Sequence, residues 1–129
     1  MAPKELPASY DITVYRGDAY YAPIRIWYRD ESGDAQLLDT DGWTGRMGVK
    51  SSKTAITHLL HSDAGQITVN TGIQGTGADA YCVEIIISKT RTAALTSGLV
   101  GVYDLELTDT SGRTRTYLAG TFCVEGDVS

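Results

Sequence analysis

The 129-residue sequence lacks any apolar run of about 20 residues, the length that a membrane-spanning helix requires. Its first residues, MAPKELPASY, also lack the apolar segment of a secretory signal. We therefore expect neither a spanning helix nor a signal peptide, and we expect no membrane partner.

Cysteine and positive charge are both scarce. The two cysteines, Cys82 and Cys123, are too few for a disulfide framework in a chain of this size. They are typical of small half-buried residues on strands, and a bridge remains open if those strands are neighbours. With 11 basic and 16 acidic residues, the net charge is −5. Because phosphate binding needs a basic face, we expect no nucleic-acid partner.

The G-x-S-x-G, P-loop and H-E-x-x-H motifs of common enzyme classes are absent. Asp104 and Glu106 are alternate residues of one expected strand, so they share a face and could act as acid and base. A position beside Arg113 or Arg115 on the partner strand favours cross-strand ion pairs instead. We expect no enzymatic activity and no cofactor.

Potential metal ligands occur in three places, but none has a complete pattern. His58 and His61 would point to opposite faces of a strand, and no neighbouring residues complete a zinc set. The acidic loops at 30–34 (DESGD) and 39–42 (DTDG) lack the spacing of an EF-hand. Because Asp and Gly are ordinary loop residues, we expect no metal site, although a weak calcium site at these loops stays open.

Apolar residues recur at every second position along much of the chain. Tyr10, Ile12 and Val14 alternate with more polar residues, and the same period recurs at 24–28 and 103–107. This alternation predicts strands with one face toward a core.

One segment breaks this period. In SKTRTAALTSG (88–98), Ser88 is a good helix N-cap and Gly98 a good stop, which predicts a short helix. The run AALTSGLVGVYDLEL is similar to an immunoglobulin-type corner, in which the tyrosine hydroxyl, here that of Tyr103, bonds to upstream backbone.

We therefore expect an all-β fold, an antiparallel immunoglobulin-like β-sandwich of about eight strands with one short helix near residues 88–95. A flexible N-terminal arm at 1–9 would precede a single domain at 10–126.

The tripeptide Arg16-Gly17-Asp18 matches a cell-adhesion signal. A match this short arises easily by chance, and strands are expected on both sides of it. Gly17 can supply a positive φ, and Asp18 can cap the turn through its side chain. We interpret the tripeptide as a turn.

Aromatic residues crowd into the 14 residues from Tyr15 to Tyr28. Several must face solvent if the alternation holds, and Tyr and Trp are enriched at protein interfaces. The alternative is that half of them belong to the core and the rest cover sheet edges. Our candidate partner-binding residues are Tyr15, Tyr20, Tyr21 and Trp27.

The order of these patterns resembles the small β-sandwich structural proteins of tailed bacteriophages. The resemblance lies in DITVYRGDAYYAPIRI, DGWTGRMGVKSS, ITVN, VEIIISKTRTAAL and GVYDLELTDTSGRTRTYLAGTFCVEGDV, which together cover nearly the whole chain. It is similar to the N-terminal module of baseplate upper proteins and to minor tail proteins. The matching patterns are strands and turns, so the resemblance implies no catalytic, cofactor or metal residues.

The resemblance implies a non-enzymatic virion structural protein that binds other virion proteins. The first expectation is a tail- or baseplate-associated adaptor or minor tail protein, located in the virion. A capsid (head) decoration protein is the alternative, and a homo-oligomer stays open. A carbohydrate-binding β-sandwich module is a third hypothesis, because exposed aromatic rings can stack on sugars.

Overall fold

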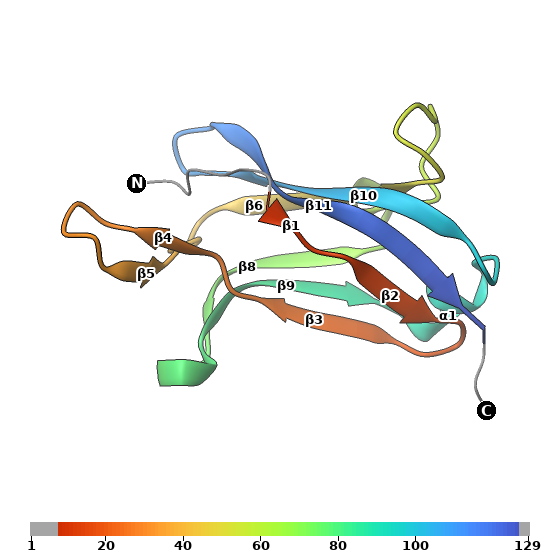
Figure 1. Cartoon of the computed structure of the whole chain (residues 1–129), viewed down its shortest axis with the longest axis horizontal. Coiled ribbons are helices and arrows are strands. Elements are labelled where there is room, and N and C mark those ends of the chain that lie inside the picture. The colour runs from red at the N-terminus through yellow and green to blue at the C-terminus, as the bar shows by residue number, and fades with distance from the viewer. Residues whose placement is uncertain (1–7, 127–129) are drawn as a thin grey trace.

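The computed structural model describes residues 8–126 and shows two sheets packed as layers, seen edge-on in Figure 1. The larger sheet consists of β1 (Ala8–Ser9), β2 (Ile12–Tyr15), β6 (Thr44–Lys50), β7 (Leu60–His61), β10 (Val100–Thr108) and β11 (Thr114–Glu125). The smaller sheet consists of β3 (Tyr20–Ile24), β8 (Thr68–Gln74) and β9 (Tyr81–Ile87). A separate hairpin, β4 (Trp27–Arg29) and β5 (Ala35–Leu37), projects from one end.

The strand order confirms the immunoglobulin-like sandwich. The smaller sheet has the order β3-β9-β8, and β10 lies between β11 and β6 in the larger one. These two orders match the B-E-D and G-F-C strands of the immunoglobulin fold. Residues 8–126 contain eleven strands rather than about eight. β1 and β5 are too short for alternation to reveal them, and the strand expected at 24–28 is divided between the end of β3 and β4.

The predicted short helix is also confirmed, as α1 (Lys89–Ala93), with Ser88 as its N-cap. Two single 3-10 turns, η1 (Ser62–Ala64) and η2 (Gly77–Asp79), occur in loops. Within the described residues, no helix is both long and apolar enough to cross a membrane.

The core lies between the two sheets and is filled by the predicted inward positions. Ile12 and Val14 are 1% exposed, and Leu105 and Leu107 are fully buried. β9 contributes alternate buried side chains, while Ile86 between them is only partly covered on the outer face. Removal of this apolar surface from water is the main force that holds the sheets together.

The N-terminal arm predicted at 1–9 falls mostly outside the described residues, which begin at Ala8. Ala8 and Ser9 form β1 and pair in parallel with Leu118 and Ala119 of β11. These two residues therefore belong to the larger sheet.

The Arg16-Gly17-Asp18 segment is a turn, as predicted. Gly17 has a φ of 86°, and the Asp18 N–H donates to the Tyr15 carbonyl at 3.0 Å. The expectation that the Asp18 side chain caps the turn is wrong. The buried hydroxyl of Thr92 on α1 does so instead, accepting from the Gly17 N–H at 3.1 Å and donating to the Asp18 carbonyl at 2.9 Å.

The Arg16 side chain is also used internally. Its guanidinium donates to the Ala93 carbonyl at 3.1 Å, at the end of α1. This contact holds the arginine of the adhesion-like tripeptide against the protein's own helix, which further favours the structural interpretation.

The Tyr103 hydroxyl bonds to upstream backbone, as predicted, but its partner is far away in the sequence. The hydroxyl donates to the carbonyl of Tyr10, which lies between β1 and β2. Gly120 faces Tyr103 across β10 and β11, and a Cβ there would collide with that carbonyl. The missing side chain allows the N-terminal segment to approach, so this tyrosine connects distant strands rather than neighbouring backbone.

The two cysteines do not form a bridge. Cys82 is buried on β9 of the smaller sheet, and Cys123 is half-buried on β11 of the larger one; both are free thiols. Burial raises the pKa of the Cys82 thiol.

Replacement of Thr92 by Val removes a fully buried hydroxyl that contacts two backbone groups of the turn. We expect Thr92→Val to lower the free energy of unfolding by about 1–3 kcal/mol, because the Gly17 N–H loses its partner. Urea denaturation measures the change. Thr92→Ser keeps the hydroxyl and is the matched control; equal losses in both variants would contradict the hydrogen-bond explanation.

Candidate functional site

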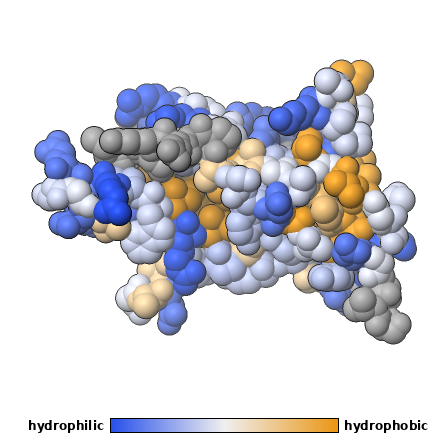
Figure 2. Space-filling view, viewed as in Figure 1, coloured by the Kyte–Doolittle hydropathy of each residue, from blue (hydrophilic) through white to orange (hydrophobic). Residues whose placement is uncertain are grey.

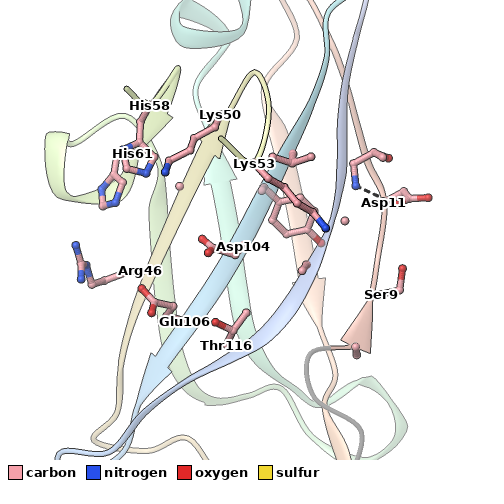
Figure 3. Close-up of a pocket in the computed structure, with 17 residues that line it drawn as sticks. Ser9, Asp11, Arg46, Lys50, Lys53, His58, His61, Asp104, Glu106 and Thr116 are labelled. Carbon is pink, nitrogen blue, oxygen red and sulfur yellow. Dashed lines mark hydrogen bonds between the residues drawn. The ribbon is translucent and has the colours of Figure 1, made fainter. Parts of the chain in front are cut away.

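A groove of about 790 Å³ runs over the outer face of the larger sheet (Figure 3). Outward-facing residues of β10 and β11 form its floor. The loop between β6 and β7 forms one wall, and the segment containing Ser9 and Asp11 forms the other. The groove is therefore formed by the sheet face together with the two connecting segments that rise above it.

Missing side chains keep the floor open. Asp104 lies on β10 directly between Gly48 of β6 and Ala119 of β11. Neither neighbour has a side chain beyond Cβ, so neither covers the Asp104 carboxylate, and the His58 ring occupies the space above Gly48. Glu106, the next outward residue of β10, lies between Arg46 and Thr116.

Sequence reasoning predicted ion pairs from Asp104 and Glu106 to Arg113 or Arg115, and this is wrong. A register shift between Leu105 and Glu106 places Thr116 opposite Glu106. Arg113 instead pairs with Asp109 within the β10–β11 turn, at 3.3 Å. Among the residues that the structure describes, neither Asp104 nor Glu106 has an ion pair within 4.0 Å.

The side of the groove at the end of β6 and in the following loop is basic. Lys50 is the outward residue at the end of β6, and Lys53 follows in the loop (Figure 3). Sequence reasoning did not identify these two lysines, because nothing in their spacing connects them to Asp104. The sequence feature that could have indicated the floor of the groove is the pair of glycine-containing segments, MGVK and LAG, which lie on either side of β10 in the sheet.

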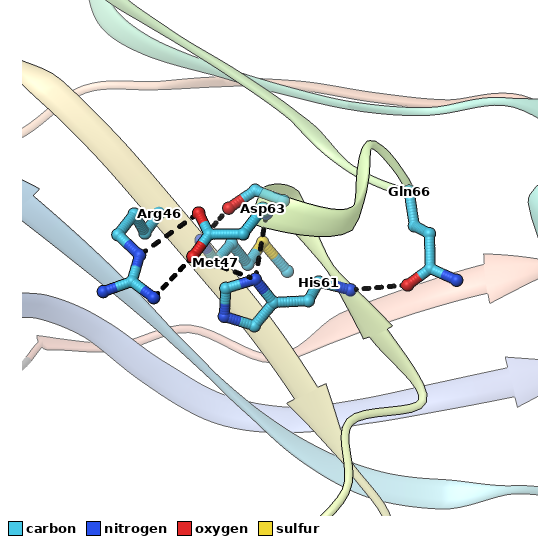
Figure 4. A network of polar contacts seen from close by, with 6 residues as sticks. Arg46, Met47, His61, Asp63 and Gln66 are labelled. Atoms are coloured by element: carbon cyan, nitrogen blue, oxygen red, sulfur yellow. Dashed lines mark hydrogen bonds and ion pairs between the residues drawn. The ribbon is translucent and has the colours of Figure 1, made fainter.

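A polar network fixes the rim beside the groove (Figure 4). Arg46 Nη2 donates to Asp63 Oδ2 at 2.6 Å, and the Arg46 contact lowers the pKa of the Asp63 carboxyl. His61 Nδ1 accepts from the Asp63 backbone N–H at 2.9 Å, and the Ser62 hydroxyl accepts from Met47 N–H at 3.0 Å. These bonds attach the loop to β6, and they commit the histidine and serine to backbone groups rather than to each other.

His58 and His61 lie together, contrary to the prediction that they point to opposite faces. The expected strand is shorter than predicted, since only Leu60–His61 is extended and His58 lies in the loop before it. The two rings meet edge to face with their centroids 4.4 Å apart. Loss of hydration and the neighbouring His61 lower the pKa of His58.

No metal site emerges from the candidates. Across residues 8–126, no group of three His, Cys, Asp or Glu side chains is placed to hold a metal ion. In the acidic loops, Asp30 Oδ1 accepts from the N–H groups of Ser32 and Asp34 at 3.0 Å each, and Asp39 Oδ1 accepts from Asp41 N–H at 3.0 Å. These carboxylates accept hydrogen bonds from backbone N–H groups of their own turns.

The four candidate aromatic residues do not form one surface. Tyr15 ends β2, Tyr21 lies on β3 of the other sheet, and Trp27 begins the β4–β5 hairpin at the far end of the molecule (Figure 1). These three side chains are 44%, 53% and 53% exposed. Tyr20 is half-buried, and burial raises its pKa to about 12. None of the four lines the groove.

Tyr21 belongs to a polar cluster that the sequence did not reveal. Glu84 Oε2 accepts from the hydroxyls of Tyr21 and Tyr81 at 2.8 and 3.0 Å, and Glu84 Oε1 accepts from Asn70 Nδ2 at 2.8 Å. The four residues come from three strands of the smaller sheet, so only strand pairing brings them together.

Some of the exposed apolar side chains lie at the end of the molecule where β10 begins (Figure 2). Ile56 in the β6–β7 loop is 94% exposed, and Val100 at the start of β10 is 65% exposed. Val102, the next outward residue of β10, lies in the floor of the groove. The floor of the groove therefore has an apolar residue, Val102, next to the charged Asp104 and Glu106.

No family model matches the sequence, and no curated protein matches it. Among the solved structures that match, two distant likenesses are as follows. One is a structure from work on the multimeric cell-adhesive interactions of VGSC beta subunits, with a TM-score of 0.46, 10% identity and 98% of both chains covered. The other is the sialic acid binding region of a Streptococcus sanguinis SK1 adhesin bound to 3'sLn, with a TM-score of 0.44 and 16% identity. It covers 98% of this chain and 29% of the adhesin chain. At this similarity neither bears on a ligand or partner.

Gly48 allows the His58 ring to rest on the floor of the groove. A Cβ at this position would lie 2.7 Å from His58 Cδ2 and 2.8 Å from Nε2. We expect Gly48→Ala to push the ring toward solvent and raise the pKa of His58 toward its ordinary value, because dehydration lowers it in the wild type. NMR titration of the imidazole measures this shift. Thr116→Ala, on the other side of the floor, should leave the titration unchanged, and a Gly48→Ala variant that titrates like the wild type would refute the packing argument.

Proposed function

We propose that this protein is a non-enzymatic structural protein of a tailed-bacteriophage virion and binds other virion proteins through the groove on its larger sheet. The observation that carries the proposal is the open, charged groove beside an apolar end, on a face with no covering element among the described residues. The strand and turn patterns quoted above support the phage assignment, because they resemble tail and baseplate proteins.

The chemistry of the groove suits recognition rather than catalysis. The Ser62 and Asp63 side chains hold the loop on β6, and the His61 side chain accepts from the Asp63 N–H within the loop. Lys50, Asp104 and Glu106 remain available to a partner. Interfaces combine an apolar centre with polar groups whose charges complement those of the partner, and this face offers both.

Attachment to the tail or baseplate is our first form of the proposal, since the resemblance is to tail and baseplate proteins. Capsid decoration is the second form, because the same face could bind capsid subunits. In either place, symmetric repetition would strengthen a weak individual contact through multiplicity.

A carbohydrate-binding module is a separate candidate, favoured by the cluster on the smaller sheet. The exposed Tyr21 ring lies beside a carboxylate and an amide from Glu84 and Asn70, groups that bind sugar hydroxyls. A glycan array separates this candidate from the structural one. Binding that disappears in Tyr21→Ala would favour the sugar, and an empty array would remove this candidate.

Copy number in purified particles tests the proposal directly. Quantitative mass spectrometry against the major capsid protein should detect the chain in the virion. A few to some tens of copies would match a tail or baseplate component at a site limited by symmetry, and hundreds would match capsid decoration. Complete absence from particles would overturn the virion proposal.

Trp27 tests the predicted aromatic contacts. Its side chain is 53% exposed on the projecting hairpin, so its removal should leave the core intact. Trp27 does not line the groove, so the hairpin would be a second contact surface. If it is, Trp27→Ala should reduce incorporation into particles while the thermal unfolding temperature changes little. Ile73→Ala is the matched control, since Ile73 is an exposed apolar residue on another strand. Unchanged incorporation of Trp27→Ala would remove this residue from the interface.

A further inference from the structure

Three oxygen atoms on the smaller sheet lie within hydrogen-bond distance of one another. They are the hydroxyl oxygens of Tyr21 and Tyr81 and the Oε2 atom of Glu84. The two hydroxyl oxygens are 2.9 Å apart, and they lie 2.8 and 3.0 Å from Glu84 Oε2. Asn70 Nδ2 donates to the other carboxylate oxygen, Oε1, at 2.8 Å. We call these four residues the acceptor cluster.

The acceptor cluster holds fewer hydrogen atoms than its three oxygen contacts require. A phenol carries a single O–H group, and an ionised carboxylate carries none. Both hydroxyls donate to Glu84, so no hydrogen is left for the contact between the two hydroxyl oxygens. The hydrogen bonds from Asn70 and Tyr21 lower the pKa of the Glu84 carboxyl, so it is ionised at neutral pH and supplies no hydrogen either. The positions that remain on these oxygens are lone pairs, which need a donor from outside the cluster.

The negative charge of Glu84 has no counter-charge in the molecule. Among residues 8–126, no Lys, Arg or His side chain lies within 4.0 Å of its carboxylate. Glu84 lies on the central strand of the smaller sheet, level with Pro23 of β3 and Asn70 of β8, so neither neighbouring strand places a cation opposite it. Three hydrogen bonds fix the carboxylate in one orientation. The cluster is therefore a rigid site of negative charge on the opposite sheet from the groove.

The surroundings of the cluster leave room for a ligand. The Tyr21 side chain is 53% exposed, and Tyr21 lies level with the partly covered Ile86 of β9. On the β8 side, Asn70 and Glu84 line a hollow of about 610 Å³ that Trp43 also lines. An exposed aromatic ring, a fixed carboxylate and an open hollow thus lie next to one another.

We propose that the acceptor cluster binds an arginine side chain of a partner protein. A guanidinium group carries about five N–H donors and no acceptor, which complements a site whose remaining positions are lone pairs. It can donate to the cluster while its flat face stacks on the Tyr21 ring. Arginine is also enriched at protein interfaces. The inference depends neither on the groove nor on the virion role.

Other ligands complement the acceptor cluster less well. A sugar hydroxyl donates a single hydrogen and brings lone pairs of its own, whereas both tyrosine hydrogens are already used. A calcium ion takes about six to eight oxygen ligands. Within the part of the chain that the structure describes, no group of three His, Cys, Asp or Glu side chains could hold a metal ion. A lysine ammonium supplies charge and donors but lacks the planar fork that stacks on a ring.

Titration of the full chain with short peptides tests the arginine site. The probe is acetyl-Gly-Arg-Gly-amide. Its citrulline analogue has the same shape without the charge, and its lysine analogue has the charge without the planar group. NMR should show saturable shifts of the Asn70 side-chain amide and the Ile86 backbone amide, with a Kd of about 1–10 mM for the arginine peptide. We expect affinity about threefold lower for the lysine peptide and no saturable shift with the citrulline peptide.

Two substitutions separate the contributions of charge and of the oxygen contacts. Glu84→Gln removes the charge and should weaken binding of the arginine peptide about tenfold or more. Tyr21→Phe keeps the ring but removes one of the three oxygens, and should weaken binding about threefold. Tyr15→Phe is the matched control and should bind like the wild type, because Tyr15 is 44% exposed on the larger sheet. Circular dichroism confirms that each variant is folded.

Equal affinity for the arginine and citrulline peptides would overturn the arginine site, as would a titration without saturable shifts at the cluster. Shifts that spread over the whole surface and persist in Glu84→Gln would mean that the peptide responds only to the net charge of −5, which would also overturn the site. A glycan that binds the wild type but not Tyr21→Ala, together with no response to the arginine peptide, would assign the cluster to a sugar instead. None of these results bears on the presence of the protein in particles, so the virion proposal is tested separately.

Discussion

The register of β10 between β11 and β6 is the constraint on which the rest of the structure depends. Its inward residues, Tyr103, Leu105 and Leu107, are buried in the core, and its outward residues, Asp104 and Glu106, form the floor of the groove. Because side chains alternate along a strand, a slip of one residue would exchange the two sets. Burial of the inward set therefore fixes the position of the charges on the outer face, and the site follows from the stability of the core.

Two buried side chains connect N-terminal segments to parts of the chain that are distant in the sequence. Tyr103 reaches the Tyr10 carbonyl past Gly120, and Thr92 joins α1 to the turn at Gly17. Both are buried polar groups with partners far away in the sequence. A buried polar group without a partner is costly, so each contact favours one arrangement of the chain over its alternatives. The adhesion-like tripeptide is part of this internal framework.

A rigid sheet face with fixed charges is suited to recognition. The groups that could do chemistry, among them His61 and Ser62, are committed to holding the loop, whereas the charges of the floor remain open. Such a face distinguishes partners by charge pattern and shape, and its individual contacts are modest. Symmetric repetition in a virion would make modest contacts sufficient.

The sequence by itself determined the features that depend on neighbouring residues. The period of two predicted the inward faces of the strands, Gly17 predicted the turn, and Ser88 predicted the start of α1, because each is a local preference of the backbone. Only the tertiary structure decided which strands are neighbours. The contact of His58 with His61, the cluster around Glu84 and the position of Asp104 between Gly48 and Ala119 were therefore not predictable. Contacts between residues far apart in the sequence set the register shift next to Glu106 and the pairing of β10 with β6. The local sequence pattern therefore does not predict either feature.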